Sequence, residues 1–338
     1  MAYVGIDLHK NASQVCIYDE ETEGYIERRV RTDFDGLRRA LEQHSGSKVL
    51  LEASTESEWV AQWLEELGYE VVVADPNFAP MYARRNRRIK TDRRDARALC
   101  DACRHGTYRP SHRRSAERRR WQAQLRVREA LVRTRTKFIS QTRALVRQRG
   151  YRVPSGAART FATRVEALEL PSDLMELLDP LLSLLSELNR RIGECDERLK
   201  QIVRNDEVVQ RLCTTVGVGP VTAVSFVATV DRAERFESAR SLRCYLGLVP
   251  REHSSSERRQ LGAITKQGNT RTRSLLVEAA HCILRNRREE TAHLRAWAER
   301  IRARRGLRIA AVALARKLAG ILFAMWRDGT TFGLPQPA

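Results

Sequence analysis

The first 105 residues combine strand-like and helix-like hydrophobic patterns. Apolar runs and apolar-polar alternation predict five strands, and apolar residues three or four apart predict three helices. The predicted strands cover residues 2–7, 13–18, 25–30, 48–52 and 69–74, and the predicted helices cover 35–44, 57–67 and 91–103. Three successive strands followed by alternating helices and strands predict an α/β domain with a mixed sheet.

The pattern changes after residue 110. Residues 115–150 and 172–203 carry apolar side chains at helical spacing, which predicts two long helices that form an antiparallel hairpin or a coiled coil between subunits. Pro180 either kinks the second helix or marks its start. From residue 206 onward the pattern is mainly helical, with a loop-rich centre at 247–269. We therefore predict an α/β domain at 1–112, a long helical, coiled-coil middle for oligomerisation at 113–205 and a mainly α domain at 206–338.

The composition is that of a folded protein of 338 residues, 42% of them hydrophobic. The seven cysteines are odd in number and irregularly spaced, which indicates reduced thiols. The first residues meet a charge at Asp7 before an apolar signal segment could form. The apolar stretch 308–326 is interrupted by Arg316 and Lys317, so we expect an amphipathic helix and no membrane span. Together these features predict a cytoplasmic protein.

Positive charge is concentrated in one stretch of the chain. The net charge is +19, and residues 84–120 contribute +11 of it. Arginine dominates, and its planar guanidinium suits phosphate oxygens, so the stretch favours nucleic-acid binding over a merely solubilising surface. A second basic zone lies toward the C-terminus. The candidate nucleic-acid-binding residues are Arg84, Arg85, Arg87, Arg88, Lys90, Arg93, Arg94, Lys266, Arg271 and Arg273.

Four acidic residues have a spacing that suits a metal site. Asp7 and Glu52 each end a predicted strand, and Asp92 and Asp95 lie three apart at the start of a predicted helix. Converging carboxylates repel one another unless divalent cations neutralise them, and their hard oxygens suit Mg²⁺. Each acid also has a simpler interpretation, since Asp7 could cap a turn and Asp92 could cap the helix.

Three segments of the first domain resemble a known family. Residues 4–10 (VGIDLHK), 50–53 (LLEA) and 90–96 (KTDRRDA) resemble the N-terminal domain of the DEDD insertion-sequence transposases, which have a RuvC-like, RNase H-type fold. The resemblance implies that Asp7, Glu52, Asp92 and Asp95 are catalytic and bind Mg²⁺. The KTDRRDA segment is the most specific of the three.

The C-terminal region resembles the second domain of the same family. The similar segments are 246–250 (LGLVP), 254–256 (SSS), 264–269 (ITKQGN) and 273–276 (RSLL). In that family a serine five residues after the proline is the nucleophile, and this position is Ser255. The family usually has glycine next, whereas this chain has Ser256 and Glu257, so Ser254 and Ser256 are alternatives. Without the resemblance, three adjacent serines would indicate a polar loop.

The resemblance implies a DNA transposase that cuts and rejoins strands through a covalent phosphoserine intermediate. It also implies Mg²⁺, donor and target DNA, a structured bridge RNA that pairs with both, and homodimers and tetramers. Two alternatives remain open. One is a metal-dependent RuvC-like junction nuclease without serine chemistry, and the other is a non-catalytic nucleic-acid-binding protein.

Overall fold

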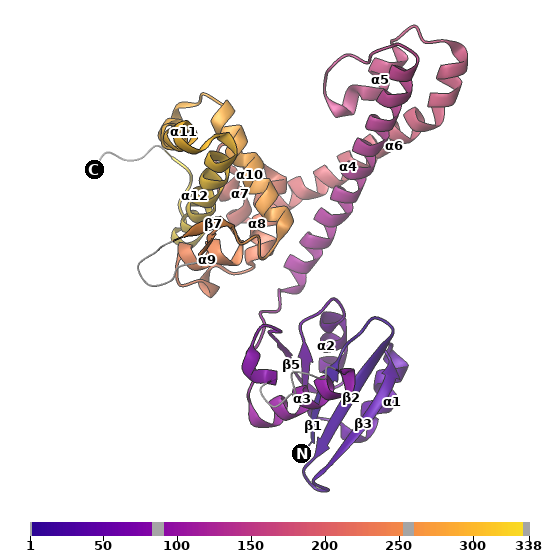
Figure 1. Ribbon diagram of the computed structural model, residues 1–338, viewed down its shortest axis with the longest axis vertical. Helices are drawn as coiled ribbons and strands as arrows, with labels where there is room; N and C mark the ends of the chain where they lie inside the picture. Colours follow the sequence, from indigo (N-terminus) through magenta and orange to yellow (C-terminus); the bar gives the residue numbers. More distant parts are fainter. Residues whose placement is uncertain (1, 83–90, 253–259, 334–338) are drawn as a thin grey trace. The chain divides into compact units, whose positions relative to one another are not determined.

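The computed structural model describes residues 2–82, 91–252 and 260–333. The chain forms two compact units, residues 1–113 and 114–338, each with its own core (Figure 1). We describe each unit by itself.

The N-terminal unit contains a five-stranded mixed sheet. Its elements are β1 (Ala2–Asp7), β2 (Ala12–Asp19), β3 (Gly24–Arg31), α1 (Phe34–Leu41), η1 (Glu42–His44), β4 (Lys48–Glu52), α2 (Ser57–Glu66), β5 (Glu70–Ala74), η2 (Ala79–Tyr82) and α3 (Asp92–His105). The strand order is β3-β2-β1-β4-β5, with antiparallel pairing among β1, β2 and β3 and parallel pairing of β1, β4 and β5. The predicted α/β domain with a mixed sheet is confirmed, and the end of the predicted helix 35–44 is a separate 3₁₀ turn.

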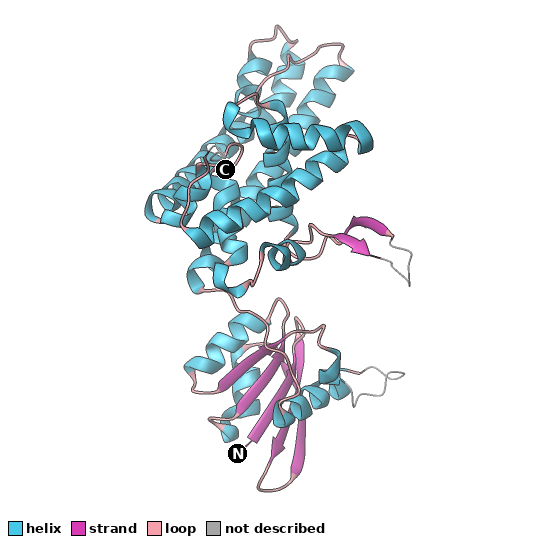
Figure 2. Cartoon of the chain, turned by 90° about the vertical axis from the view of Figure 1, so that its left-hand side faces the viewer, coloured by secondary structure: helices cyan, strands magenta, loops and turns pink. Residues whose placement is uncertain are grey.

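Helices cover both faces of this sheet, as the alternation of side chains along β1 requires (Figure 2). Val4 and Ile6 are fully buried on the face that packs against α1 and α2. The other face receives α3, whose Ala96 and Cys100 are buried against β2 residues such as Cys16. Helices exclude water from both faces of the sheet, so the central strands are almost entirely apolar. The acidic residues of these strands lie only at the strand ends.

Among its described residues, the second unit is helical apart from one antiparallel pair of short strands. Its elements are α4 (Ala116–Gln148), η3 (Ala158–Thr160), α5 (Phe161–Glu166), α6 (Ser172–Asn205), α7 (Glu207–Cys213), α8 (Pro220–Val230), η4 (Ala233–Arg235), α9 (Ala239–Tyr245), β6 (Pro250–Glu252), β7 (Leu261–Ile264), α10 (Thr270–Arg285), η5 (Glu289–Thr291), α11 (Ala292–Arg305) and α12 (Leu307–Asp328). The antiparallel pair β6 and β7 lies where we expected only loops (Figure 2). The strands are three and four residues long, too short for a periodic pattern to reveal them.

The two long helices pack against each other within one chain. Arg128 pairs with Asp196 at 2.5 Å, and Arg135 donates to Asn189 at 3.0 Å, which gives an antiparallel helical hairpin. This confirms the hairpin interpretation. Pro180 lies inside α6, so the idea that it marks the helix start is wrong. Its missing N–H costs one hydrogen bond in a helix that leucine packing stabilises.

Helix α12 forms part of the core of the second unit. Within the described residues it is the one helix long and apolar enough to cross a membrane, and 56% of its apolar window is buried inside the protein. Leu314, Leu318 and Leu322 are fully buried in the core that α12 shares with α9, α10 and α11. The apolar character of this segment is therefore explained by packing in the protein core.

Candidate active site

Two of the predicted acidic residues end neighbouring parallel strands. β1 and β4 pair in a register that places Ile6 beside Leu51. The next residues along the chain are Asp7 and Glu52, so both carboxylates leave the sheet at the same edge. Such an edge, beyond the carboxyl ends of parallel strands, is where ligands bind in open α/β sheets.

Helix α3 brings the other two acids to this edge. It lies so close to β1 that a Cβ added to Gly5 would be 2.2 Å from the Cys100 backbone nitrogen. The helix begins with Thr91 as its N-cap, whose side chain accepts a hydrogen bond from the Arg94 backbone. Asp92 is therefore not the cap. It lies with Asp95 in the first turn, where the helix dipole favours negative charge.

The four carboxylates interact electrostatically. Asp7 is only 9% exposed, and burial raises the pKa of its carboxyl to about 6. His9 lowers this pKa, whereas the negative charges of Asp95, Asp92 and Glu52 raise it. Like charges held this close to a buried carboxyl are costly unless a cation or a proton neutralises them.

His9 lies within the acidic cluster. Its Nε2 atom is 3.4 Å from an oxygen of Asp7 and 3.4 Å from an oxygen of Asp92. Ligand atoms of these three residues lie within 4.8 Å of one another. An imidazole nitrogen and two carboxylate oxygens at this spacing can hold one divalent cation, so the donor set fits Mg²⁺ or Mn²⁺. His9 stands two residues after Asp7 in the sequence, whereas its proximity to Asp92 is shown only by the structure.

Tyr82 is a further member of the site that we did not predict from the sequence. Its hydroxyl donates to Glu52 Oε2 at 2.6 Å, and both burial and this carboxylate raise the pKa of the phenol. The hydrogen bond fixes the orientation of Glu52 at the strand end. A tyrosine thirty residues away in the sequence gives no signal of such a contact.

We expect Tyr82→Phe to weaken divalent-metal binding by about tenfold, because loss of a hydrogen bond that orients a ligand typically has this effect. Mn²⁺ titration followed by thermal shift of the full-length protein measures the change. Tyr25→Phe is the matched control, since Tyr25 donates to Asp101 at 2.6 Å on the same domain but outside the acidic cluster. Equal losses in both variants would contradict a role for Tyr82 at the metal site.

Many arginines of the 84–120 stretch have partners within their own unit. Arg93 forms an ion pair with Glu27, and Arg109 forms one with Asp75. Arg104 lies 3.9 Å above the centre of the Tyr18 ring. The net charge of the stretch thus overstates the free positive surface, because counting along the chain ignores acids from other elements. Arg94 is exposed on α3, and the remaining candidates Arg84, Arg85, Arg87, Arg88 and Lys90 lie outside the described residues.

The candidate nucleophile Ser255 and its alternatives Ser254 and Ser256 also lie outside the described residues, between β6 and β7. The segments on either side of them pack backbone against backbone. A Cβ on Gly247 would be 2.1 Å from the Gln267 carbonyl oxygen, and one on Gly268 would be 2.0 Å from that of Tyr245. The LGLVP and ITKQGN segments therefore pack directly against each other.

The three basic candidates that follow β7 in the sequence, Lys266, Arg271 and Arg273, lie in different environments. Lys266 is exposed and has φ of 58°, a strained backbone conformation for a residue other than glycine. Arg271 pairs with Glu129 and lines a cavity of about 450 Å³ together with Arg126 and Arg133. Arg273 is 7% exposed and donates to the carbonyls of Leu246 and Gln267, so its guanidinium stabilises the two packed segments.

Two family models match this chain over both units. Residues 4–149 match the DEDD domain of IS110-type transposases, and residues 209–295 match the model described as transposase IS116/IS110/IS902 family. Together with the acidic cluster at the sheet edge, they define an insertion-sequence transposase, an enzyme that cuts and rejoins DNA. The chain belongs to the IS116/IS110/IS902 family.

Whole-length relatives agree with this assignment. The chain is 32% identical over 338 residues to the "Probable family 20 transposase" of Pseudomonas aeruginosa, covering 98% of both proteins. It is 31% identical to the transposase for insertion sequence element IS1111A of Coxiella burnetii, covering 97% of this chain and 90% of the relative. It is 32% identical to the transposase for IS1328 of Yersinia enterocolitica, covering 97% and 98%.

Proposed function

We propose that this transposase cuts and rejoins DNA by two sites acting together. Asp7, Glu52, Asp92 and Asp95 bind Mg²⁺, and Ser255 forms a covalent bond to a DNA phosphate. The observation that carries the proposal is the acidic cluster, in which burial and three neighbouring carboxylates raise the pKa of Asp7 to about 6. Perturbed carboxyl groups gathered at one sheet edge are typical of functional sites, and a bound cation would neutralise their repulsion.

The acidic residues have separate tasks in this proposal. Asp7 and Asp92 supply oxygens to the cation, and His9 contributes its Nε2 atom or holds the two carboxylates in place. Glu52 is kept in position by the hydroxyl of Tyr82. The bound divalent ion would supply Lewis-acid activation of the phosphodiester. Arg94 and the basic residues before α3 would bind the flanking phosphates.

Serine supplies the covalent step. The Ser255 Oγ forms a bond to phosphorus, the bond between phosphorus and one deoxyribose oxygen breaks, and the serine proton ends on the released hydroxyl. In the second step a deoxyribose hydroxyl of the new partner strand attacks phosphorus, the bond between phosphorus and Ser255 Oγ breaks, and the proton of that hydroxyl passes to the serine. One phosphoester bond replaces another at each step, so no external energy source is needed. Lys266, exposed beside this hairpin, is suited to stabilise the developing negative charge.

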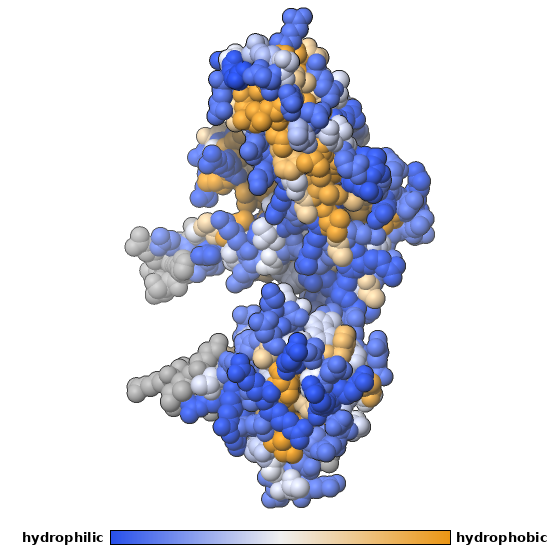
Figure 3. Space-filling model, turned by 90° about the vertical axis from the view of Figure 1, so that its right-hand side faces the viewer, coloured by the Kyte–Doolittle hydropathy of each residue, from blue (hydrophilic) through white to orange (hydrophobic). Residues whose placement is uncertain are grey.

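The proposed complex contains several protein copies and a guide. Leu177 and Leu184 on α6 are 61% and 49% exposed and one heptad apart, which suits pairing with another subunit. Apolar residues, in orange, are visible on the surface of the second unit (Figure 3). We propose dimers and tetramers that act in the cytoplasm. A structured bridge RNA would select donor and target DNA by base pairing, as guide pairing does in other RNA-directed systems.

A covalent-adduct assay tests the function. The full-length protein is incubated with bridge-RNA candidates from its own element, labelled donor and target DNA, and Mg²⁺, then separated on a denaturing gel. We expect a DNA–protein band that disappears in Ser255→Ala and remains in Ser254→Ala and Ser256→Ala. We expect Asp92→Ala to reduce the band more than about 100-fold, since loss of a group that merely supports a ligand already costs 10- to 100-fold.

The remaining outcomes separate the alternatives. Asp35→Asn, an exposed acid in the first turn of α1, is the control for general charge loss and should leave the band unchanged. Cleaved DNA without an adduct, retained in Ser255→Ala, would reject the serine mechanism and establish a metal-dependent junction nuclease. Binding that is unaffected by either substitution, with no cleavage under any condition, would indicate a non-catalytic nucleic-acid-binding protein.

A further inference from the structure

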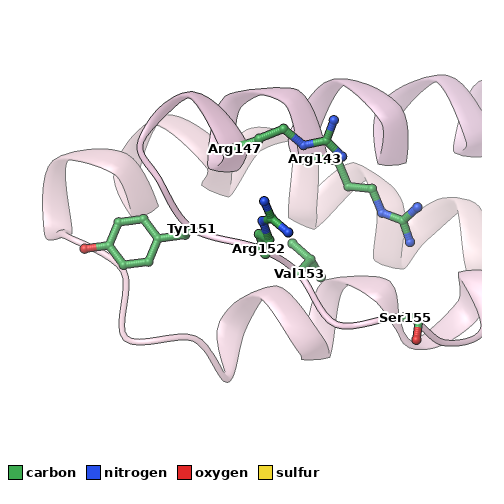
Figure 4. A pocket seen from close by; sticks show the side chains of 6 residues that line it. All are labelled: Arg143, Arg147, Tyr151, Arg152, Val153 and Ser155. Atoms are coloured by element: carbon green, nitrogen blue, oxygen red, sulfur yellow. The ribbon is translucent and has the colours of Figure 1, made fainter.

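A cavity of about 380 Å³ lies at the end of the helical hairpin formed by α4 and α6. Figure 4 shows two of its arginines extending from α4, while its other residues belong to the segment that follows the helix. The lining residues are Arg143, Arg147, Tyr151, Arg152, Val153 and Ser155. This cavity belongs to the second unit and shares no residue with the acidic cluster or with the hairpin that flanks Ser255.

The cavity lies in a stretch of the chain without acidic residues. Between Glu129 and Glu166 the sequence contains nine basic residues and no aspartate or glutamate. Some of these arginines have partners elsewhere, since Arg149 pairs with Asp173. Among the residues that the structure describes, no carboxylate pairs with any of the three arginines that line the cavity. Three cations around one hollow, without counter-charges from the protein, have the charge and hydrogen-bond donors to bind anionic groups.

The segment that completes the cavity is held in one conformation. Gly150 ends α4 with φ of 85°, and the Tyr151 backbone donates to the Val146 carbonyl at 3.2 Å. Arg164 donates to the carbonyls of Pro154 and Ala157 at 2.6 Å and 2.8 Å. The backbone of this segment is thus fixed before any ligand arrives, which reduces the entropy lost on binding.

Tyr151 adds an aromatic surface beside the cations. It is 37% exposed, and its ring points away from the three guanidinium groups (Figure 4). Aromatic side chains next to arginines bind unpaired nucleotides, because each base has a π-face and each linking phosphate a negative charge. A base pair within a duplex offers no free face of this kind.

We propose that this cavity, the hairpin-tip pocket, binds an unpaired nucleic-acid strand. Arg143, Arg147 and Arg152 contact successive phosphates, the Ser155 hydroxyl donates to one of them, and Tyr151 stacks on a base. The inference rests on the proposed function only for the class of partner, and it assigns a contact far along the chain from both catalytic sites. A single-stranded loop of RNA and an exposed strand of DNA share this chemistry.

Fluorescence anisotropy of the full-length protein tests the proposal. The probes are labelled oligonucleotides of about 12 nucleotides, as single-stranded RNA, single-stranded DNA of the same sequence and the DNA duplex. The buffer contains a chelator, so that neither the metal site nor cleavage affects the result. We expect the triple variant Arg143→Gln, Arg147→Gln, Arg152→Gln to bind single strands at least tenfold more weakly. The slope of log affinity against log salt should fall by about 2, since each phosphate contact on a single strand contributes about 0.7.

Two further variants give the test its specificity. Arg159→Gln is the control for the loss of one positive charge, because Arg159 is exposed in the same acid-free stretch but does not line the pocket, and we expect it to weaken binding less than threefold. Tyr151→Ala should weaken single-strand binding by about tenfold and leave duplex binding unchanged, as loss of one stacked base predicts. All these side chains are exposed, so the substitutions should leave the fold intact.

The outcomes decide whether the pocket binds an unpaired strand and whether that strand is RNA or DNA. Stronger binding of RNA than of DNA in the wild type, abolished in the triple variant, supports the pocket and identifies an RNA loop as the ligand. The reverse preference supports it with a DNA strand as the ligand. Losses no larger per charge than in Arg159→Gln, or equal losses for duplex and single strands, would overturn it. A loss of single-strand binding in the triple variant beyond that of the Arg159→Gln control, together with cleaved DNA but no covalent adduct in the assay described above, would support the pocket and reject the serine mechanism.

Discussion

Asp7→Asn is expected to lose more than about 100-fold in DNA cleavage and at the same time to make the metal-free protein more stable near pH 8. The first effect follows from the loss of a metal ligand. The second follows from the raised pKa of Asp7, about 6 against an ordinary value of 3.8. Because the pKa of Asp7 is higher in the folded protein than in the unfolded chain, the stability that comes from its protonated carboxyl is fully present below a pH of 3.8, the ordinary pKa. It is lost as the pH rises through about 6.

The size of the gain follows from the same shift. Two pKa units correspond to roughly 3 kcal/mol, and relaxation of the site reduces this, so we expect about 2 kcal/mol near pH 8 and no gain near pH 4. Thermal unfolding of the full-length protein with chelator, monitored by circular dichroism, should show an N-terminal transition on the order of 10 °C higher. Mg²⁺ should raise this transition in the wild type and leave it unchanged in the variant.

Asp35→Asn controls for the loss of one negative charge and should show none of these effects, because Asp35 is exposed on α1. If Asp7→Asn lowered the stability of the metal-free protein near pH 8, Asp7 would be a structural residue whose carboxylate is stabilised by the fold. That result would remove the main support for a metal site at this sheet edge.

Gly5→Ala is expected to destabilise the N-terminal unit by about 3 kcal/mol or more and to abolish metal binding. The added Cβ would lie 2.2 Å from the Cys100 nitrogen and 2.4 Å from the Ala96 oxygen. Both are backbone atoms of α3, so no side chain can turn aside, and the whole helix must move. Since α3 carries Asp92 and Asp95, the movement would separate them from Asp7 and Glu52.

Urea unfolding and Mn²⁺ titration of the full-length protein measure both effects. Gly24→Ala is the matched control in the same sheet, because the nearest atom to its added Cβ is the Thr22 hydroxyl at 3.4 Å, an ordinary contact. If Gly5→Ala bound Mn²⁺ as tightly as Gly24→Ala, the close packing of α3 would not be what positions the acids.

The sequence by itself determined most of the secondary structure and the identity of the four acids. The central strands β1 and β4 are almost entirely apolar because helices cover both sides of the sheet, and such runs are easily recognised. The acids end these strands or begin a helix, positions that a pattern along the chain can show. The two long helices were predictable from the leucines that repeat at helical spacing over α6, whereas the sequence left open whether they form a hairpin or a coiled coil between subunits.

Only the tertiary structure showed what surrounds the acids and which cations are free. The Tyr82 hydroxyl donates a hydrogen bond to Glu52, thirty residues away in the sequence, and Arg93 of α3 forms an ion pair with Glu27 of β3. Neither contact can be predicted from a periodic pattern in the sequence. Local charge counting placed the candidate nucleic-acid surface in residues 84–120 and toward the C-terminus, and it gave no indication of the cavity lined by arginines at the end of α4. Periodicity reports which side of an element is buried, whereas contacts between distant elements depend on how those elements pack, and this packing determines the chemistry of the site.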